Sequence, residues 1–249
     1  MVYRSGGPWV PAVQNLLRDL RTAGFGLAPE PLGVAEDSRE MISFLPGEVM
    51  PRENWRPAMF GDTVLEEAGA MLRDLHATTR DLSYPPETIW RSGPAAKVPG
   101  QVIRHGDLTP WNVLFEGDRI SGLIDWDFAE PGEPLTDLAQ MALYFVPLRG
   151  EIHARACGFE STADLPRRLH VLCAAYGSFS PSEVVAEIER LQLASMREIE
   201  ERADEGRYPW TMFRENGEIE RTLTEVAWLR CTFRAAFPGR NADSSLAAS

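Results

Sequence analysis

The sequence has no continuous run of about 18 apolar residues, and its first residues do not form an apolar secretion segment. Chains that enter or cross a membrane carry one or both of these features. No internal repeat is visible either. These absences predict a cytoplasmic protein without a membrane partner.

Cysteine is scarce and dispersed. Cys157, Cys173 and Cys231 are the three cysteines, and no Cys-x-x-Cys pair occurs. An odd number of widely spaced cysteines argues against a disulfide framework and against the usual zinc spacings. We therefore expect buried thiols in a reducing compartment.

Positive charge is in deficit, with 25 Lys and Arg residues against 37 Asp and Glu residues, a net charge of −12. Such a chain is a poor partner for the phosphates of a nucleic acid. The acidity mildly favours a cationic small molecule as ligand, although acidity for solubility alone would give the same composition. The length of 249 residues allows one large domain or two small ones.

The most informative stretch runs from His105 to Asp127. It begins with His105-Gly106-Asp107, has Asn112 five positions after that aspartate, and has Asp125 thirteen positions after the asparagine. Phosphoryl transfer needs a carboxylate to orient and deprotonate the attacking hydroxyl, and oxygen ligands that hold Mg²⁺ against the phosphates. Asp107 fits the first role, and Asn112 and Asp125 fit the second.

The segment between these residues predicts a β-hairpin. Two short apolar runs, residues 113–115 and 122–124, are separated by the turn sequence Glu-Gly-Asp at 116–118. Such a hairpin would carry Asn112 and Asp125 at the outer ends of paired strands, on the same side.

This strip resembles the Brenner motif and the metal-binding aspartate of the aminoglycoside phosphotransferase and choline kinase group, which are relatives of protein kinases. Gly106 stands where protein kinases usually carry arginine, and this favours the small-molecule kinases. Residues 134–139, with Asp137, resemble the next block of the family, and residues 44–47 resemble the segment after its adenine-contacting linker. The resemblance runs from about residue 40 to residue 145.

The resemblance implies an α+β, protein-kinase-like fold of two lobes with a curtailed N-terminal β lobe. Residues 1–47 would form the reduced N-terminal lobe and hinge, residues 48–240 the C-terminal catalytic and substrate lobe, and residues 241–249 a mobile tail. It also implies ATP and Mg²⁺ as cofactors. The γ-phosphate would go to a hydroxyl of a small molecule, an aminoglycoside by default.

The resemblance assigns further roles. His105 and Asp137 would support the catalytic loop, whose base is Asp107. The nucleotide would contact Arg4, Ser43, Phe44, Leu45, Leu114 and Ile124. A cationic acceptor would meet acidic residues, namely Asp127, Glu198, Glu201 and Asp204, although Asp127 also fits a plain turn and the last three also fit a solvated helix face.

Three departures from the family pattern leave a second reading open. The two strands and the Gly-rich loop that cover the phosphates have no counterpart, Arg4 stands in for the phosphate-binding lysine, and the paired glutamate is missing where Val13 and Gln14 occur. Arginine and lysine are not interchangeable at a phosphate. A catalytically inactive binding or immunity protein of the same fold, similar to immunity proteins against peptide toxins, is therefore the alternative. The acceptor, the oligomeric state and the natural start of the chain remain open.

Apolar spacing and turn residues predict the remaining elements. Residues 32–34 and 40–45 are expected to be paired strands, and residues 79–100 a loop. Asp62 and Ser180 are expected to cap helices, Ser180 in a capping box. The expected helices are residues 8–24, 62–78, 135–144, 166–176, 180–206 and 219–233.

Overall fold

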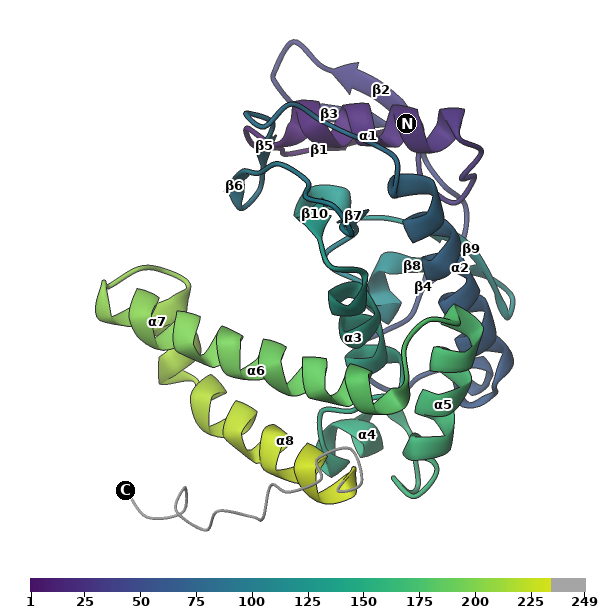
Figure 1. The fold of residues 1–249 in the computed structure, drawn as a ribbon, viewed down its shortest axis with the longest axis vertical. Coiled ribbons are helices and arrows are strands. Elements are labelled where there is room, and N and C mark those ends of the chain that lie inside the picture. The colour runs from purple at the N-terminus through teal and green to yellow at the C-terminus, as the bar shows by residue number, and fades with distance from the viewer. Residues whose placement is uncertain (234–249) are drawn as a thin grey trace.

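The computed structural model describes residues 1–233, which form the α+β fold predicted from the sequence (Figure 1). The N-terminal sheet and its helix lie at one end of the molecule, and the longer helices fill the other end. The expected tail, residues 241–249, lies outside the described residues. No helix in this part of the chain combines the length and apolar character that a membrane crossing requires.

The N-terminal sheet has three antiparallel strands, β1 (Val2–Arg4), β2 (Pro31–Val34) and β3 (Glu40–Ile42), in the order β1-β3-β2. Helix α1 (Val10–Thr22) buries its apolar face, including Leu16 and Leu20. The strands and the helix expected here are confirmed, although β3 ends at Ile42. Residue pairing in the sheet sets Arg4 directly opposite Glu40.

The predicted hairpin is also confirmed. Strands β8 (Val113–Glu116) and β9 (Arg119–Leu123) pair antiparallel, and β4 (Glu48–Val49) adds to the outer edge of β8. The turn between β8 and β9 contains Gly117 with φ +60°, a conformation that glycine adopts without cost. Asn112 and Asp125 flank the two strands at the same end of the hairpin.

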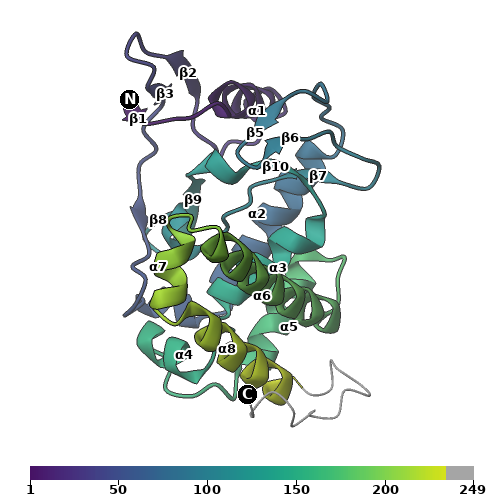
Figure 2. The same cartoon turned by 90° about the vertical axis from the view of Figure 1, so that its left-hand side faces the viewer.

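The larger part of the chain is a helical layer. Its principal helices are α2 (Thr63–Thr79), α3 (Pro134–Phe145), α5 (Leu165–Tyr176), α6 (Pro181–Asp204) and α8 (Glu218–Thr232). Helices α2 and α5 pack closely because Gly69 has no side chain, and a Cβ there would lie 2.8 Å from the Leu172 carbonyl oxygen. Helix α6 packs against α3 on one side and α8 on the other (Figure 2).

The sequence predicted these helices, but it missed shorter elements. Short helices have little apolar periodicity, and two-residue or three-residue strands have no alternation to detect. The elements that were not predicted are β5 (Ile89–Trp90), β6 (Gly93–Pro94), β7 (Val102–Arg104), β10 (Glu130–Gly132), the strand β4 described above, α4 (Glu151–Cys157), α7 (Trp210–Glu215), and the single turns η1 (Pro57–Phe60), η2 (Pro110–Asn112) and η3 (Trp126–Phe128). The first two form a small hairpin inside the expected loop.

Two local expectations were wrong and one was confirmed. Asp62 precedes α2 but makes no side-chain cap, because its carboxylate pairs with Arg167 at 2.7 Å. Cys231 is exposed, whereas the other two cysteines are buried as expected. Ser180 does begin α6 with a complete capping box together with Glu183.

Candidate active site

The catalytic loop is fixed through the ring of His105. This ring is buried, and burial is the main cause that lowers its pKa, so it is uncharged at neutral pH. Its Nε2–H donates to the carbonyl oxygen of Ile124 at 3.0 Å, and its Nδ1 accepts the Asp107 N–H at 3.2 Å. The two bonds assign the proton to Nε2. His105 therefore ties the loop to the end of β9 and does not face a ligand.

Side chains of helix α3 hold the same loop through the main-chain N–H groups of the loop. The two carboxylate oxygens of Asp137 accept the N–H groups of His105 at 2.8 Å and Gly106 at 3.1 Å. One turn further along α3, the side-chain oxygen of Gln140 accepts the Leu108 N–H at 3.0 Å. Gln140 was not predicted, although its spacing of three from Asp137 places it on the same helix face.

A buried chain of side chains stands behind Asp137. Its Oδ2 lies 3.3 Å from Nε2 of His76, whose Nδ1 lies 2.8 Å from the hydroxyl of Tyr176. Burial alone would raise the pKa of Asp137, but the hydrogen bond from His76 and the nearby positive charge of Arg104 outweigh it and lower that pKa. Burial raises the pKa of Tyr176 to about 12. Asp137 is thus an ionised carboxylate with Tyr176 kept as a hydroxyl donor.

The side chain of Asp107 is held in place by Asn112. The Asn112 amide nitrogen donates to the Asp107 carboxylate at 2.7 Å and to its carbonyl oxygen at 2.9 Å. Burial, and then the charge of Asp125, raise the pKa of Asp107, against the lowering effects of Asn112 and Arg52. A carboxylate with a raised pKa is a stronger proton acceptor than an ordinary aspartate.

Asp125 faces the same site from a left-handed backbone conformation, with φ 63° and ψ 66°. This conformation is uncommon for residues other than glycine and often occurs at functional sites. The Arg4 guanidinium donates to Asp125 at 2.7 Å and to Asp127 at 2.9 Å. Arg91 approaches the other oxygen of Asp127 at 3.4 Å. Both aspartates are therefore already paired with arginine.

A glutamate that the sequence analysis missed lies beside Arg4. Glu40, directly opposite Arg4 in the sheet, is buried, lies 3.5 Å from the Arg4 guanidinium and accepts a 2.9 Å hydrogen bond from Gln14. An acidic partner of Arg4 thus comes from β3 rather than from α1, where the family pattern would place it. Alternation along the strand could have found it only once the register was known.

The residues expected to contact the nucleotide are only partly brought together. Leu45 and Leu114 both approach Gly122, and their side chains would each be 3.1 Å from a Cβ at that position. These two of the expected residues therefore lie close together beside strand β9. Ser43 instead exchanges hydrogen bonds with the Glu30 backbone, and the side chain of Phe44 is 65% exposed. The main chain of Ile124 accepts the hydrogen bond from His105 that is described above.

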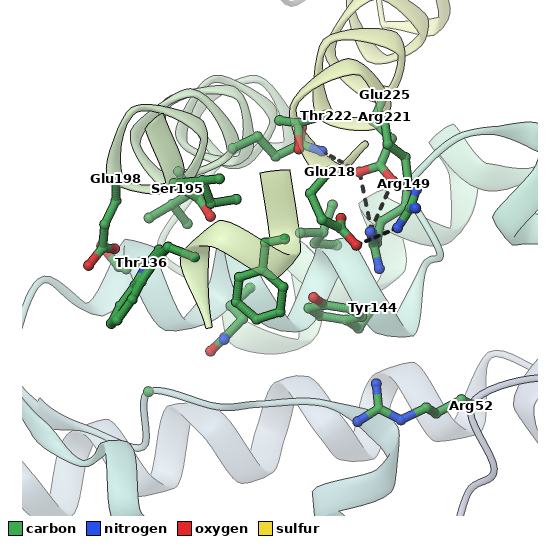
Figure 3. Close-up of a pocket in the computed structure, with 18 of the residues that line it drawn as sticks. Arg52, Thr136, Tyr144, Arg149, Ser195, Glu198, Glu218, Arg221, Thr222 and Glu225 are labelled. Carbon is green, nitrogen blue, oxygen red and sulfur yellow. Dashed lines mark hydrogen bonds and ion pairs between the residues drawn. The ribbon is translucent and has the colours of Figure 1, made fainter. Parts of the chain in front are cut away.

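A cavity of about 850 Å³ opens beside the catalytic loop and is enclosed by residues from α3, α6, α7 and α8 (Figure 3). It reaches the loop at Gly106. Of the acidic residues expected to meet an acceptor on α6, Glu198 lines this cavity, whereas Glu201 and Asp204 do not. Asp204 pairs instead with Arg214 at 2.6 Å.

Comparisons with known proteins identify the family of the segment that carries these residues. The family model of the phosphotransferase enzyme family matches residues 86–172, which include the whole strip from His105 to Asp127. The trifolitoxin immunity protein of Rhizobium leguminosarum bv. trifolii is 34% identical over 181 residues, 71% of this chain and 67% of that protein. The chain belongs to the phosphotransferase enzyme family.

Solved structures show that this member of the phosphotransferase enzyme family has the protein-kinase-like fold expected from the sequence. A choline/ethanolamine kinase family protein from Mesorhizobium loti superposes with a TM-score of 0.52 at 16% identity, covering 90% of this chain and 84% of that one. Aminoglycoside 2'-phosphotransferase-IIIa, in a complex with GDP, also gives 0.52 at 13% identity, with 88% and 82% covered.

Gly106 is required by the geometry of the loop, which leads to a prediction. Its φ is +80°, and a Cβ would lie 2.1 Å from the carbonyl oxygen of Phe128. Gly106→Ala should lower the free energy of unfolding by more than the roughly 1–2 kcal/mol that the left-handed conformation alone costs. Gly117→Ala is the matched control, because Gly117 has φ +60° with no atom within 4 Å. Equal losses in urea unfolding of the two variants would contradict the close approach at Gly106.

Proposed function

We propose that the protein is a Mg²⁺-dependent phosphotransferase that moves the γ-phosphate of ATP to a hydroxyl of a small molecule. One observation carries this proposal: the Asn112 amide orients the Asp107 carboxylate at 2.7 Å at the end of the hairpin where Asp125 also lies. Burial and, to a smaller extent, the charge of Asp125 raise the pKa of Asp107. Membership of the phosphotransferase enzyme family supports the reaction class. The GDP complex of a protein with the same fold supports a purine nucleotide as donor.

The chain's own residues account for the step at the acceptor. Asp107 accepts the proton of the acceptor hydroxyl while the hydroxyl oxygen forms its bond to the γ-phosphorus, and the bond from that phosphorus to the leaving ADP breaks. The guanidinium of Arg4 presents donors in a fork that suits phosphate oxygens. Side chains of α3 accept hydrogen bonds from the main-chain N–H groups of the loop that carries Asp107, so the base keeps its place during the reaction.

The residues at the end of the hairpin fit a magnesium ion. Asn112 uses its amide nitrogen on Asp107, which leaves its amide oxygen for a ligand, and Arg4 bonds to one oxygen of Asp125 and leaves the other. An amide oxygen and a carboxylate oxygen are the donors Mg²⁺ takes beside phosphates. When bound, the ion would neutralise charge on the phosphates.

A second function is supported by a specific observation. The relative that is 34% identical over 181 residues is named an immunity protein, and the Arg4 guanidinium already neutralises the Asp125 carboxylate at 2.7 Å. A protein of this kind would bind a ligand or a partner without transferring phosphate. Nucleotide binding separates the two functions.

Calorimetric titration with ATP, with and without Mg²⁺, tests the proposal. Binding should require Mg²⁺ and should weaken by about tenfold or more in Asp125→Ala, because a metal ligand is lost. Asp118→Ala, an exposed aspartate in the turn of the same hairpin, controls for the change in net charge. Absence of ATP binding at millimolar concentration, or binding that is independent of Mg²⁺, would favour the binding or immunity protein.

Aminoglycosides remain the acceptor class predicted from the sequence. The fold that an aminoglycoside phosphotransferase shares with this chain supports this class only in general, because one fold serves many substrates. The charged residues around the cavity bear on this choice more directly.

A further inference from the structure

Charged side chains line the acceptor cavity on several sides, and almost all of them are paired. Glu198 pairs with Arg202 at 3.4 Å, and Glu225 pairs with Arg149 at 3.0 Å. The other pairs are Glu218 with Arg221 and Arg104 with Glu130. Within residues 1–233, Arg52 is the charged residue of this lining that has no ion-pair partner. The cavity therefore has one uncompensated charge, and it is positive.

Arg52 is held in place by an aromatic ring rather than by a carboxylate. Its guanidinium carbon lies 4.3 Å from the ring centre of Trp111, within the catalytic loop, and Trp111 meets Tyr144 edge-on at 5.2 Å. Stacking on an aromatic face orients a guanidinium and leaves its N–H donors free, because they point outward in the plane of the guanidinium group. Figure 3 shows Arg52 across the cavity from Arg149 and Glu225. A preoriented donor fork thus faces the space where an acceptor would lie.

The position of Arg52 links this charge to the reacting group. Its guanidinium lies over Trp111, four residues after Asp107 in the same loop. Gly106, the neighbour of Asp107, lines the same cavity together with Tyr144. A cationic acceptor would meet this arginine, and each carboxylate of the lining is already partly neutralised by an arginine. An oxyanion would meet charge of the opposite sign.

We propose that the acceptor is a hydroxylated molecule that carries an oxyanion group, a carboxylate or a phosphate, and that Arg52 binds this group beside Asp107. This inference rests on the proposed function, whose acceptor it defines. The volume of about 850 Å³ lies within the range of pockets that bind small molecules. Leu143, Trp210 and Phe213 line the same cavity and would cover its apolar parts.

Binding of related hydroxylated compounds tests the inference. The probes are lactobionate against lactose for the carboxylate, glucose 6-phosphate against glucose for the phosphate, and kanamycin for a cation. Calorimetry without nucleotide measures their affinities independently of phosphoryl transfer. The acidic member of at least one pair should bind more tightly than its neutral relative, and kanamycin should bind more weakly than that acid. The pair that discriminates tells which oxyanion the site takes.

Variants of Arg52 show whether the contact is direct. Arg52→Gln should weaken binding of the preferred acid by about tenfold to a hundredfold, as expected for loss of a charge-assisted hydrogen bond. Arg52→Lys should restore only part of it, because lysine keeps the charge without the planar fork. Arg155→Gln is the matched control: it makes the same change in net charge on α4, where Arg155 pairs with Glu151 and does not line the cavity.

Several results would overturn the inference. These are tighter binding of kanamycin, no acid bound at millimolar concentration, or equal losses in Arg52→Gln and Arg155→Gln. Uniform loss of turnover with every acceptor, without loss of acid binding, would mean that Arg52 acts on the transferred phosphoryl group instead. If ATP fails to bind while lactobionate binding depends on Arg52, the ligand class stands and the proposed phosphotransferase reaction falls.

Discussion

Asp107→Asn should lower the turnover number by about a hundredfold to ten-thousandfold, the usual contribution of a positioned general base. The amide is nearly isosteric with the carboxylate and can still accept the 2.7 Å hydrogen bond from Asn112, but it cannot take a proton from the acceptor. Thermal unfolding and ATP affinity should change little. ADP release measured with an accepted substrate gives the loss, and turnover within about threefold of the wild type would remove Asp107 from the role of base.

The pH dependence of the same reaction provides an independent check. Below its pKa in the folded protein Asp107 carries a proton and cannot accept another, so kcat/KM should fall as the pH decreases through that pKa. Because burial and Asp125 raise the pKa of Asp107 above the ordinary value of 3.8, the fall should be centred above pH 3.8. A midpoint at or below this value, measured where the protein remains folded, would contradict the environment described for this group.

Asp137→Ala should cause the largest loss of stability, on the order of 3–5 kcal/mol, as when one partner of a buried charged network is removed. The variant leaves two main-chain N–H groups of the catalytic loop and one nitrogen of His76 without their acceptor, all in the protein interior. Urea unfolding measures the change. Asp118→Ala, in the exposed turn between β8 and β9, should change stability by less than about 0.5 kcal/mol.

A loss below about 1 kcal/mol in Asp137→Ala would mean that the loop is held mainly by other contacts. The variant Gln140→Ala then becomes informative, because Gln140 supplies the bond to the Leu108 N–H at 3.0 Å. This second variant should cost about 1–3 kcal/mol, the penalty for one buried donor left without a partner.

The strip from His105 to Asp127 was predictable because its residues act through spacing within one local unit. A hairpin of two short strands fixes where its two ends lie, so Asn112 and Asp125 could be placed without knowledge of the rest of the chain. The pairing of Arg4 with Glu40 could not be predicted, since these residues are 36 positions apart and meet only through the register of β1 with β3. The sequence alone leaves that register undetermined.

The acceptor side shows the same limit more strongly. The charged stretch on α6 offered Glu198, Glu201 and Asp204 as equivalent candidates, and only the packing of α6 against α3 and α8 decides that Glu198 faces the cavity. Arg52 stood out by no pattern at all. Its significance depends on the absence of an ion-pair partner within the described residues, and partners that are distant in sequence become visible only in the folded chain.

The bonds from α3 to the catalytic loop have a consequence for how such a protein can change over time. Asp137 and Gln140 bind N–H groups, which every residue except proline possesses. Except at Gly106 and at His105, whose ring also ties the loop to the end of β9, side chains of the loop can therefore be exchanged without loss of these bonds to α3. The cavity wall belongs largely to other helices, α6, α7 and α8. Most residues of the cavity wall therefore lie in other segments than the residues that anchor the loop, so substitutions in α6, α7 and α8 can change the cavity without disturbing the loop.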